Sequence, residues 1–177
     1  MYCGKNKTAL ASQQQIAKTL LLLLSKKAYQ DISVSELCRE AGISRQTFYS
    51  LFSSKDDVMT FFLQERCCWQ PDPDPSHSCL EQMCVNYSRY LAQQRTFIRA
   101  LVDNRIIYLL NDSLMEVLGS CACLFEDLPA QSRRYAACFL AGGFTSIAQN
   151  YVLEEPPLSE AALSRLCIDL FKGNLLL

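Results

Sequence analysis

Apolar residues recur three and four positions apart along most of the chain, and alternating apolar and polar runs between turn signals are absent. This spacing is typical of helices that bury one face. A first helix is expected over residues 8–27, and its apolar face carries Ile16, Leu20, Leu23 and Leu24. The sequence therefore predicts an all-α protein with about nine helices.

Cap residues divide the first part of the chain into four helices. Ser33 is followed three residues later by Glu36, which is the capping-box pattern, and Gly42 supplies a left-handed residue that ends this helix. Ser44 and Ser54 are further N-cap residues. These signals predict helices over residues 8–27, 33–42, 44–51 and 54–69.

A proline-rich segment, residues 70–76, stops regular structure because each Pro pushes the preceding residue out of the helical region. Helical spacing then resumes, with Gly119 as an expected irregularity. The later helices are expected over residues 77–93, 96–104, 105–125, 131–153 and 159–173. The break predicts three parts: a first domain over residues 1–53, a connecting helix over 54–69 and a second domain over 70–177.

Residues 33–52 combine a helix, a tight turn at Gly42 and a second short helix. Apolar side chains of this segment can pack inward: Val34, Leu37, Cys38, Ile43, Phe48 and Phe52. Polar side chains near the start of the second helix can face outward: Arg45, Gln46, Thr47 and Tyr49. A DNA-binding helix-turn-helix needs this division, because the outward residues enter the major groove while the other face packs. Arg and Gln match the edges of guanine and adenine, and hydroxyl groups suit phosphate oxygens.

The charge distribution favours DNA binding over an ordinary helical corner, which is the structural alternative. The formal net charge is −1, but residues 1–66 hold nine Lys and Arg against six Asp and Glu. Residues 67–177 hold eight Lys and Arg against twelve Asp and Glu. A basic first part and an acidic second part suggest that only the first meets a polyanion.

Residues 33–49 resemble the helix-turn-helix of the TetR (tetracycline-repressor-like) family, and residues 52–58 resemble the Phe-x-x-Lys segment that follows it. Residues 135–147 resemble the long penultimate helix of one carboxy-terminal subgroup. The resemblance implies a phosphate contact for Lys55. The DNA-binding residues expected on this basis are Ser33, Val34, Ser44, Arg45, Gln46, Thr47, Tyr49 and Lys55. One departure is Ala28, where the family usually has Gly; because a left-handed Ala costs about 1 kcal/mol, we expect the first helix to end differently here.

The resemblance also implies an effector pocket among the helices of the second domain. Aromatic and Met side chains recur there at helical spacing and suit an apolar ligand. The expected lining residues are Trp69, Met83, Tyr87, Tyr90, Phe97, Leu101, Tyr108 and Met115. The alternative is that these side chains form an ordinary bundle core.

A homodimer is expected because one short recognition helix reads too few bases alone. In the family, the last two helices form the dimer interface. Small residues inside the helix over 131–153 suit a close crossing, since Gly within a helix costs roughly 1 kcal/mol. The expected interface residues are Tyr135, Phe139, Gly142, Gly143, Ser146, Leu163, Leu166 and Leu170.

The sequence has ten cysteines but only one histidine, His77, so few side chains suit catalysis or metal binding. No C-x-x-C pair occurs, so we expect mostly buried structural thiols, no metal site and no cofactor. Weak redox candidates are Cys67, Cys68, Cys121 and Cys123. A Cys-nucleophile enzyme is the least favoured hypothesis, because the one candidate histidine partner, His77, directly adjoins the proline-rich segment. The five-residue run Leu20–Leu24 is far shorter than a membrane span of about 20 residues, and no cleavage site follows, so a cytoplasmic protein is expected.

The leading hypothesis is therefore a homodimeric repressor that binds a palindromic DNA operator and is released by an apolar small-molecule effector. The alternative is a regulator of the same fold, or an activator, that a protein partner controls without a small-molecule ligand. In either case the helix over 54–69 would carry the signal, because the two half-sites must match one DNA turn of roughly 34–36 Å. Cys67, Cys68 and Trp69 lie at the hinge end of that helix; simple packing is the alternative for them.

Overall fold

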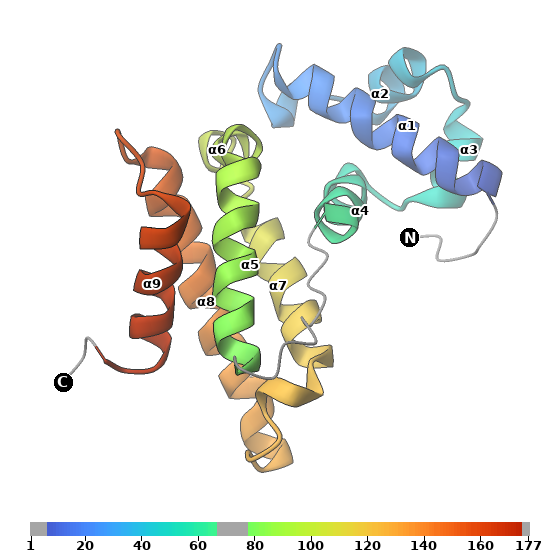
Figure 1. Ribbon diagram of the computed structural model, residues 1–177. Helices are drawn as coiled ribbons and strands as arrows, with labels where there is room; N and C mark the ends of the chain where they lie inside the picture. Colours follow the sequence, from blue (N-terminus) through green and yellow to red (C-terminus); the bar gives the residue numbers. More distant parts are fainter. Residues whose placement is uncertain (1–6, 67–77, 175–177) are drawn as a thin grey trace. The chain divides into compact units, whose positions relative to one another are not determined.

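The computed structural model describes residues 7–66 and 78–174, and every regular element within these ranges is a helix (Figure 1). The chain divides into two compact units, Met1–Arg66 and Cys67–Leu177. The fold is all-α, as the sequence predicts. Within the described ranges, no helix is both long enough and apolar enough to cross a bilayer.

The first unit contains α1 (Lys7–Leu24), a 3₁₀ turn η1 (Tyr29–Asp31), α2 (Val34–Ala41), α3 (Arg45–Leu51) and α4 (Lys55–Arg66). Helix α1 packs against both α2 and α4. The core consists of apolar side chains that recur at helical spacing on these elements, and the largest fully buried ones are Ile16, Leu20, Ile32, Leu37, Phe48, Phe52, Met59 and Leu63.

The second unit contains α5 (Cys79–Gln93), α6 (Arg95–Asp103), α7 (Tyr108–Ser120), a 3₁₀ turn η2 (Ala122–Leu124), α8 (Ala130–Leu153) and α9 (Glu160–Phe171). Helix α5 packs against α9, and α7 and α6 pack against α8. In Figure 1 these helices form a bundle in which α5, α8 and α9 lie lengthwise side by side. The Tyr87 hydroxyl donates to the Phe144 carbonyl at 2.8 Å and so joins α5 to α8 inside the core.

The start of α5 and the end of α9 are joined by an ion pair. Ser78 caps α5 in a full capping box with Glu81, and Lys172 Nζ donates to Glu81 Oε1 at 2.6 Å. The Lys172 hydrogen bond, together with those from Ser78, lowers the pKa of Glu81 to about 2. The Glu81 carboxylate therefore keeps its charge well into acidic solution.

Several helix ends differ from the sequence prediction. Helix α1 ends at Leu24 rather than residue 27, and Ala28 is extended, with φ −61° and ψ 145°. Ala28 therefore carries no left-handed strain and instead precedes η1. Further along, the helix predicted over residues 105–125 begins only at Tyr108 and ends at Ser120. The reason is that Arg105 is left-handed, with φ 58°, and ends α6 through Ile106 N–H donating to the Leu101 carbonyl.

Candidate DNA-binding interface

Hydrogen bonds at three turn residues fix the angle between α2 and α3. The Ser33 hydroxyl accepts from the Glu36 amide at 3.1 Å, and the Ser44 hydroxyl accepts from the Thr47 amide at 3.0 Å. Between them, Gly42 is left-handed, with φ 67°, and closes α2. Both ends of α2 and the start of α3 are thus capped by residues that the sequence analysis marked as caps.

The two faces of α3 carry different side chains. Phe48 and Leu51 are buried in the core of the unit. Arg45, Gln46 and Tyr49 are exposed on the other side. The helix has no acidic residue, so nothing on α3 itself repels a phosphate backbone. This arrangement presents a guanidinium, an amide and a phenol from one helix, which are groups that pair with base edges and phosphates.

The remaining expected contact residues lie beside this face. Thr47 is partly buried, and its hydroxyl lies 2.8 Å from the Ser44 hydroxyl. Ser33 is exposed and Val34 partly buried at the start of α2. Their contact with DNA stays a prediction.

Lys55, the first residue of α4, is held by its own unit. Its ammonium group donates to the carbonyls of Tyr29 at 2.6 Å and Ile32 at 3.0 Å, and lies 4.2 Å from the centre of the Tyr29 ring. Burial of the ammonium group lowers the pKa of Lys55. The Tyr29 hydroxyl in turn donates to Asp56 at 2.6 Å. A lysine has three N–H donors, so the predicted phosphate contact of Lys55 would use the one that is not aimed at these two carbonyls.

The position of Lys55 predicts a double effect for Lys55→Ala. Two charge-assisted hydrogen bonds from α4 to the Tyr29 and Ile32 carbonyls are lost, so we expect the first unit to lose about 2 kcal/mol of stability. At temperatures where the variant is folded, DNA binding should weaken equally on all sequences. The slope of log affinity against log salt concentration should fall in magnitude by about one. Thermal unfolding and fluorescence anisotropy at several salt concentrations measure the two effects separately. A lowered melting temperature with an unchanged salt slope would show that Lys55 is only structural.

The residues expected to line an effector pocket lie in several environments. Met83, Tyr87, Tyr90 and Leu101 are buried in the bundle core, where the Tyr87 ring lies 4.6 Å from that of Phe144. Phe97 and Met115 are partly buried, whereas Tyr108 is 46% exposed. Trp69, like the proposed hinge residues Cys67 and Cys68, lies outside the described residues.

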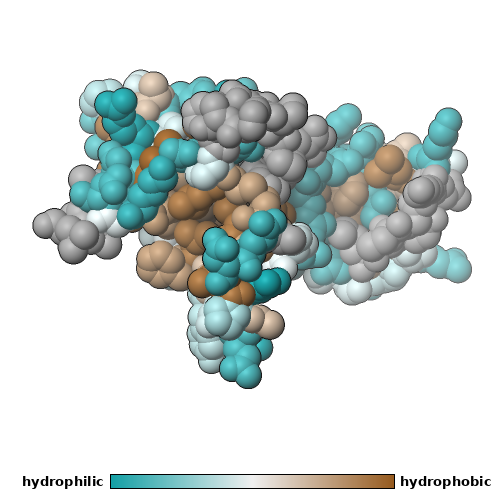
Figure 2. Space-filling model, turned by 60° about the horizontal axis from the view of Figure 1, so that its bottom comes forward, coloured by the Kyte–Doolittle hydropathy of each residue, from teal (hydrophilic) through white to brown (hydrophobic). Residues whose placement is uncertain are grey.

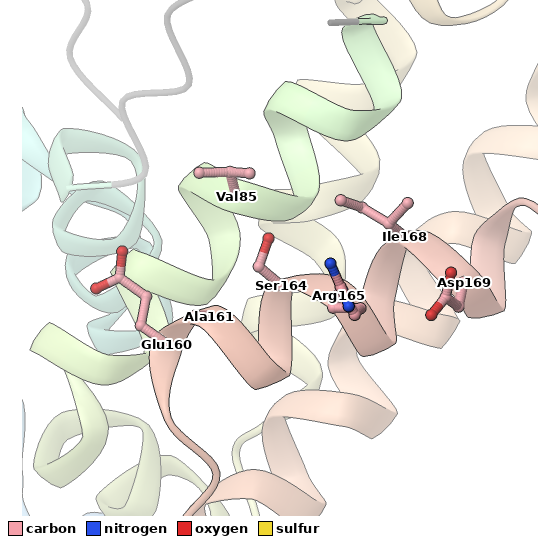
Figure 3. Close-up of a pocket in the computed structure, with 7 residues that line it drawn as sticks. All are labelled: Val85, Glu160, Ala161, Ser164, Arg165, Ile168 and Asp169. Carbon is pink, nitrogen blue, oxygen red and sulfur yellow. The ribbon is translucent and has the colours of Figure 1, made fainter.

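Residues that the structure describes line two hollows on the second unit. One, of about 350 Å³, lies between the end of α7 and the start of α8, and of the expected lining residues it includes Met115. Its other lining residues are Gly119, Ser120, Cys121, Phe125, Arg133, Arg134 and Ala137. The second, of about 610 Å³, lies between α5 and α9, where Val85 lies across from Ser164 (Figure 3). None of the expected effector residues lines the second hollow. The roles of Phe144 and Phe125 were missed, because helical spacing does not tell which core positions meet.

Most of the expected dimer residues lie on or near the surface of α8 and α9. Tyr135 is 77% and Phe139 is 68% exposed, and the space-filling view shows apolar residues gathered on this unit beside hydrophilic ones (Figure 2). Ser146 is exposed, and Gly142, Gly143, Leu166 and Leu170 are partly buried. Leu163 differs: it is only 1% exposed and belongs to the core of its own protomer, so its assignment to an outer face is corrected. Exposed large aromatic side chains of this kind mark interaction surfaces.

Contacts within one protomer explain why one of the two adjacent glycines is required. A Cβ at Gly143 would lie 2.7 Å from the Phe171 ring, which packs against Phe144 at 4.4 Å between ring centres and approaches Phe139 at 6.5 Å. A Cβ at Gly142 would meet nothing within 4 Å. Gly143 therefore makes room for α9, and the open space at Gly142 has no such explanation inside the protomer.

A capped helix-turn-helix with outward polar side chains on its second helix is the arrangement with which DNA-binding proteins of this kind enter the major groove. The family model for bacterial regulatory proteins of the tetR family matches residues 16–60, which extend from the second half of α1 through the first half of α4. Over these residues the chain is similar to the TetR family. Among curated relatives, it is 34% identical over 95 residues to the HTH-type dhaKLM operon transcriptional activator DhaS of Lactococcus lactis subsp. lactis (strain IL1403). The match covers 54% of this chain and spans about half the length of that relative, 51%.

Solved structures share the whole fold at low sequence identity. Lin0861 from Listeria innocua superposes with a TM-score of 0.78 at 13% identity, covering 98% of this chain and 96% of its own. A TetR transcriptional regulator from Streptococcus agalactiae 2603V gives a TM-score of 0.61 at 15% identity, covering 94% of this chain and 96% of its own. These likenesses extend the fold assignment to the second unit.

Proposed function

We propose that this chain acts as a homodimer that binds a palindromic operator through α2 and α3 and regulates transcription there. The observation that carries the proposal is the exposed set Arg45, Gln46 and Tyr49 on α3, opposite the buried Phe48. The set is presented by a seven-residue helix, which contacts only a few base pairs. Two copies related by a two-fold axis would supply the second half-site that specific binding needs.

The surface of α8 supports the proposed dimer. Tyr135 and Phe139 are exposed aromatic side chains four residues apart, so they lie on one side of the helix. Gly142 is one turn further along and has open space around its Cβ position. A second copy of α8 could approach closely at this glycine and cover both rings.

An effector that releases the regulator is the leading form of control in this proposal. The hollow at the end of α7 supports it, because the apolar side chains of Met115 and Phe125 line it beside two arginines. A ligand acts only if it binds the DNA-competent and incompetent arrangements with unequal affinity. A screen of apolar ligands by thermal shift, followed by operator titration with each hit, tests this form.

A second candidate is an activator that a protein partner controls. It is favoured by one observation: the L. lactis relative is a transcriptional activator. The burial of Met83, Tyr87 and Leu101 also fits a core that is already filled. In this case transcription from the target promoter rises on adding the protein, whereas a repressor lowers it.

The experiment that tests the shared part of both candidates is an electrophoretic shift with DNA flanking the chain's own gene. We expect a specific complex that survives excess competitor DNA, at a stoichiometry of two chains per site. If competitor DNA abolishes binding at every site tested, the proposal is rejected. Run-off transcription on the bound fragment then separates repressor from activator.

A further inference from the structure

The hollow at the end of α7, of about 350 Å³, has an apolar floor. Among its lining residues, Cys121, Phe125 and Ala137 are buried and Met115 is partly buried. An aromatic ring and a thioether both make favourable contacts with the rings and chains of apolar molecules. The volume lies at the lower end of the range for small-molecule sites, so the hollow suits a small ligand.

A glycine leaves room on the α7 side of this hollow. Gly119 lies inside α7, where Gly destabilises a helix relative to Ala. Its φ is not positive, and a Cβ placed on it would meet nothing within 4 Å. Packing inside the protomer therefore does not require a glycine here, in contrast to Gly143, which faces the Phe171 ring. The missing side chain keeps the hollow open where Gly119 lines it.

Two arginines near the start of α8 line the other side of the hollow. Arg133 and Arg134 are both exposed. Arg133 Nε donates to the Leu128 carbonyl at 3.1 Å, which anchors the guanidinium and leaves its two terminal amino groups as donors. None of the ion pairs between described residues includes either arginine, and none of the described lining residues is acidic. The hollow thus combines an apolar floor with two unneutralised positive charges.

We propose that this hollow binds a small apolar carboxylate. Arg133 and Arg134 hold the carboxylate group, and the apolar body of the ligand lies against Met115 and Phe125. A guanidinium suits this role because its fork of N–H groups pairs with both oxygens of a carboxylate. A neutral ligand of the same shape would fill the hollow but leave both arginines without a partner. That the ligand controls DNA binding rests on the proposed function, whereas the binding site itself does not.

The test titrates the full chain by calorimetry with two carboxylates, hydrocinnamate and octanoate, and with their neutral primary amides. Each amide has the shape of its acid but lacks the charge. We expect both carboxylates to bind, roughly tenfold or more tighter than the amides, because hydrogen bonds to a charged group are the stronger ones. If neither carboxylate binds, or if the amides bind equally well, the proposal is overturned.

Variants at the arginines test where the carboxylate lies. The double variant Arg133→Gln/Arg134→Gln should lower carboxylate affinity to that of the amide and leave amide binding as it is. Arg165→Gln is the matched control, because Arg165 is an exposed arginine that lines the other hollow. It should leave both affinities unchanged. Equal loss in the control, or no loss in the double variant, would place the carboxylate elsewhere and reject the proposal.

Gly119→Leu tests the hollow itself. The new side chain occupies the open space, so the carboxylates and the amides should all stop binding. The melting temperature of the free protein should not fall, because the new Cβ meets nothing within 4 Å and Leu favours a helix over Gly. Binding at the wild-type affinity in this variant would show that the ligand does not enter the hollow.

A gel shift with operator DNA, run in parallel, keeps this proposal apart from the proposed function. If the wild-type protein binds its operator but neither carboxylate, the ligand site is rejected and the DNA-binding proposal stands. If the carboxylates bind but no DNA is bound specifically, the ligand site stands and the proposed function is rejected. A several-fold change in operator affinity on adding hydrocinnamate, absent in Gly119→Leu, would support both.

Discussion

Replacing Arg45 with Ala is expected to weaken specific operator binding by about 1–3 kcal/mol, which is roughly a 5- to 150-fold loss of affinity. The guanidinium lies at the first position of α3 and is exposed, so its removal leaves Phe48 and the core of the unit intact. A bidentate contact to a base edge is lost, and the preference at one base pair should relax. Anisotropy titrations against operators changed at each position measure both effects.

Arg39→Ala is the matched control for this experiment. Arg39 is an exposed arginine on α2 that pairs with Glu40 at 3.2 Å, so the variant removes the same charge from the same unit. It should change affinity uniformly across sequences and leave the base preference as it is. If neither Arg45→Ala nor Gln46→Ala alters operator affinity, α3 is not the reading element.

The second large effect is expected from the neighbouring glycines of α8. Gly142→Leu should leave the protomer folded, because the new Cβ meets nothing within 4 Å and Leu favours a helix over Gly by about 0.8 kcal/mol. If α8 faces a second copy, the same side chain blocks close approach, and the protein becomes monomeric. Operator affinity should then fall toward the non-specific level, by a factor of roughly 10³ or more.

Gly143→Leu provides the contrast. Its Cβ would meet the Phe171 ring at 2.7 Å, so this variant should lower the melting temperature of the protomer itself. Sedimentation velocity at micromolar concentration and thermal unfolding distinguish the two variants. If the Gly142→Leu protein stays dimeric and binds its palindrome, the dimer interface does not include this part of α8.

Features encoded within a few residues were predictable from the sequence. Ser33, Gly42 and Ser44 act on neighbours three or four positions away, and the structure has each of them at the expected helix end. Arg105 shows the limit of such signals: a helix boundary was predicted next to it, but Arg105 takes the left-handed position that Gly usually fills, so the later start of α7 at Tyr108 was not predicted.

Features that depend on distant contacts were not predictable in the same way. The carbonyls that hold Lys55 belong to Tyr29 and Ile32, more than twenty residues earlier, and a turn of 3₁₀ helix brings them together. Helical spacing placed Leu163 in an apolar stripe of α9. It could not show whether that residue lies on the inner or the outer side of the helix. Only packing between elements decides these cases.

The end of α9 has a practical consequence for anyone shortening or tagging this chain. Phe171 fills the space over Gly143, and Lys172 is bonded to Glu81 at the start of α5. Removing these two residues would leave a cavity about the size of an aromatic ring beside Phe144 and release the first turn of α5. Left-handed Gly173, with φ 78°, has already ended the helix. A purification tag or fluorescent fusion is therefore best joined after Gly173, where it prolongs no helix.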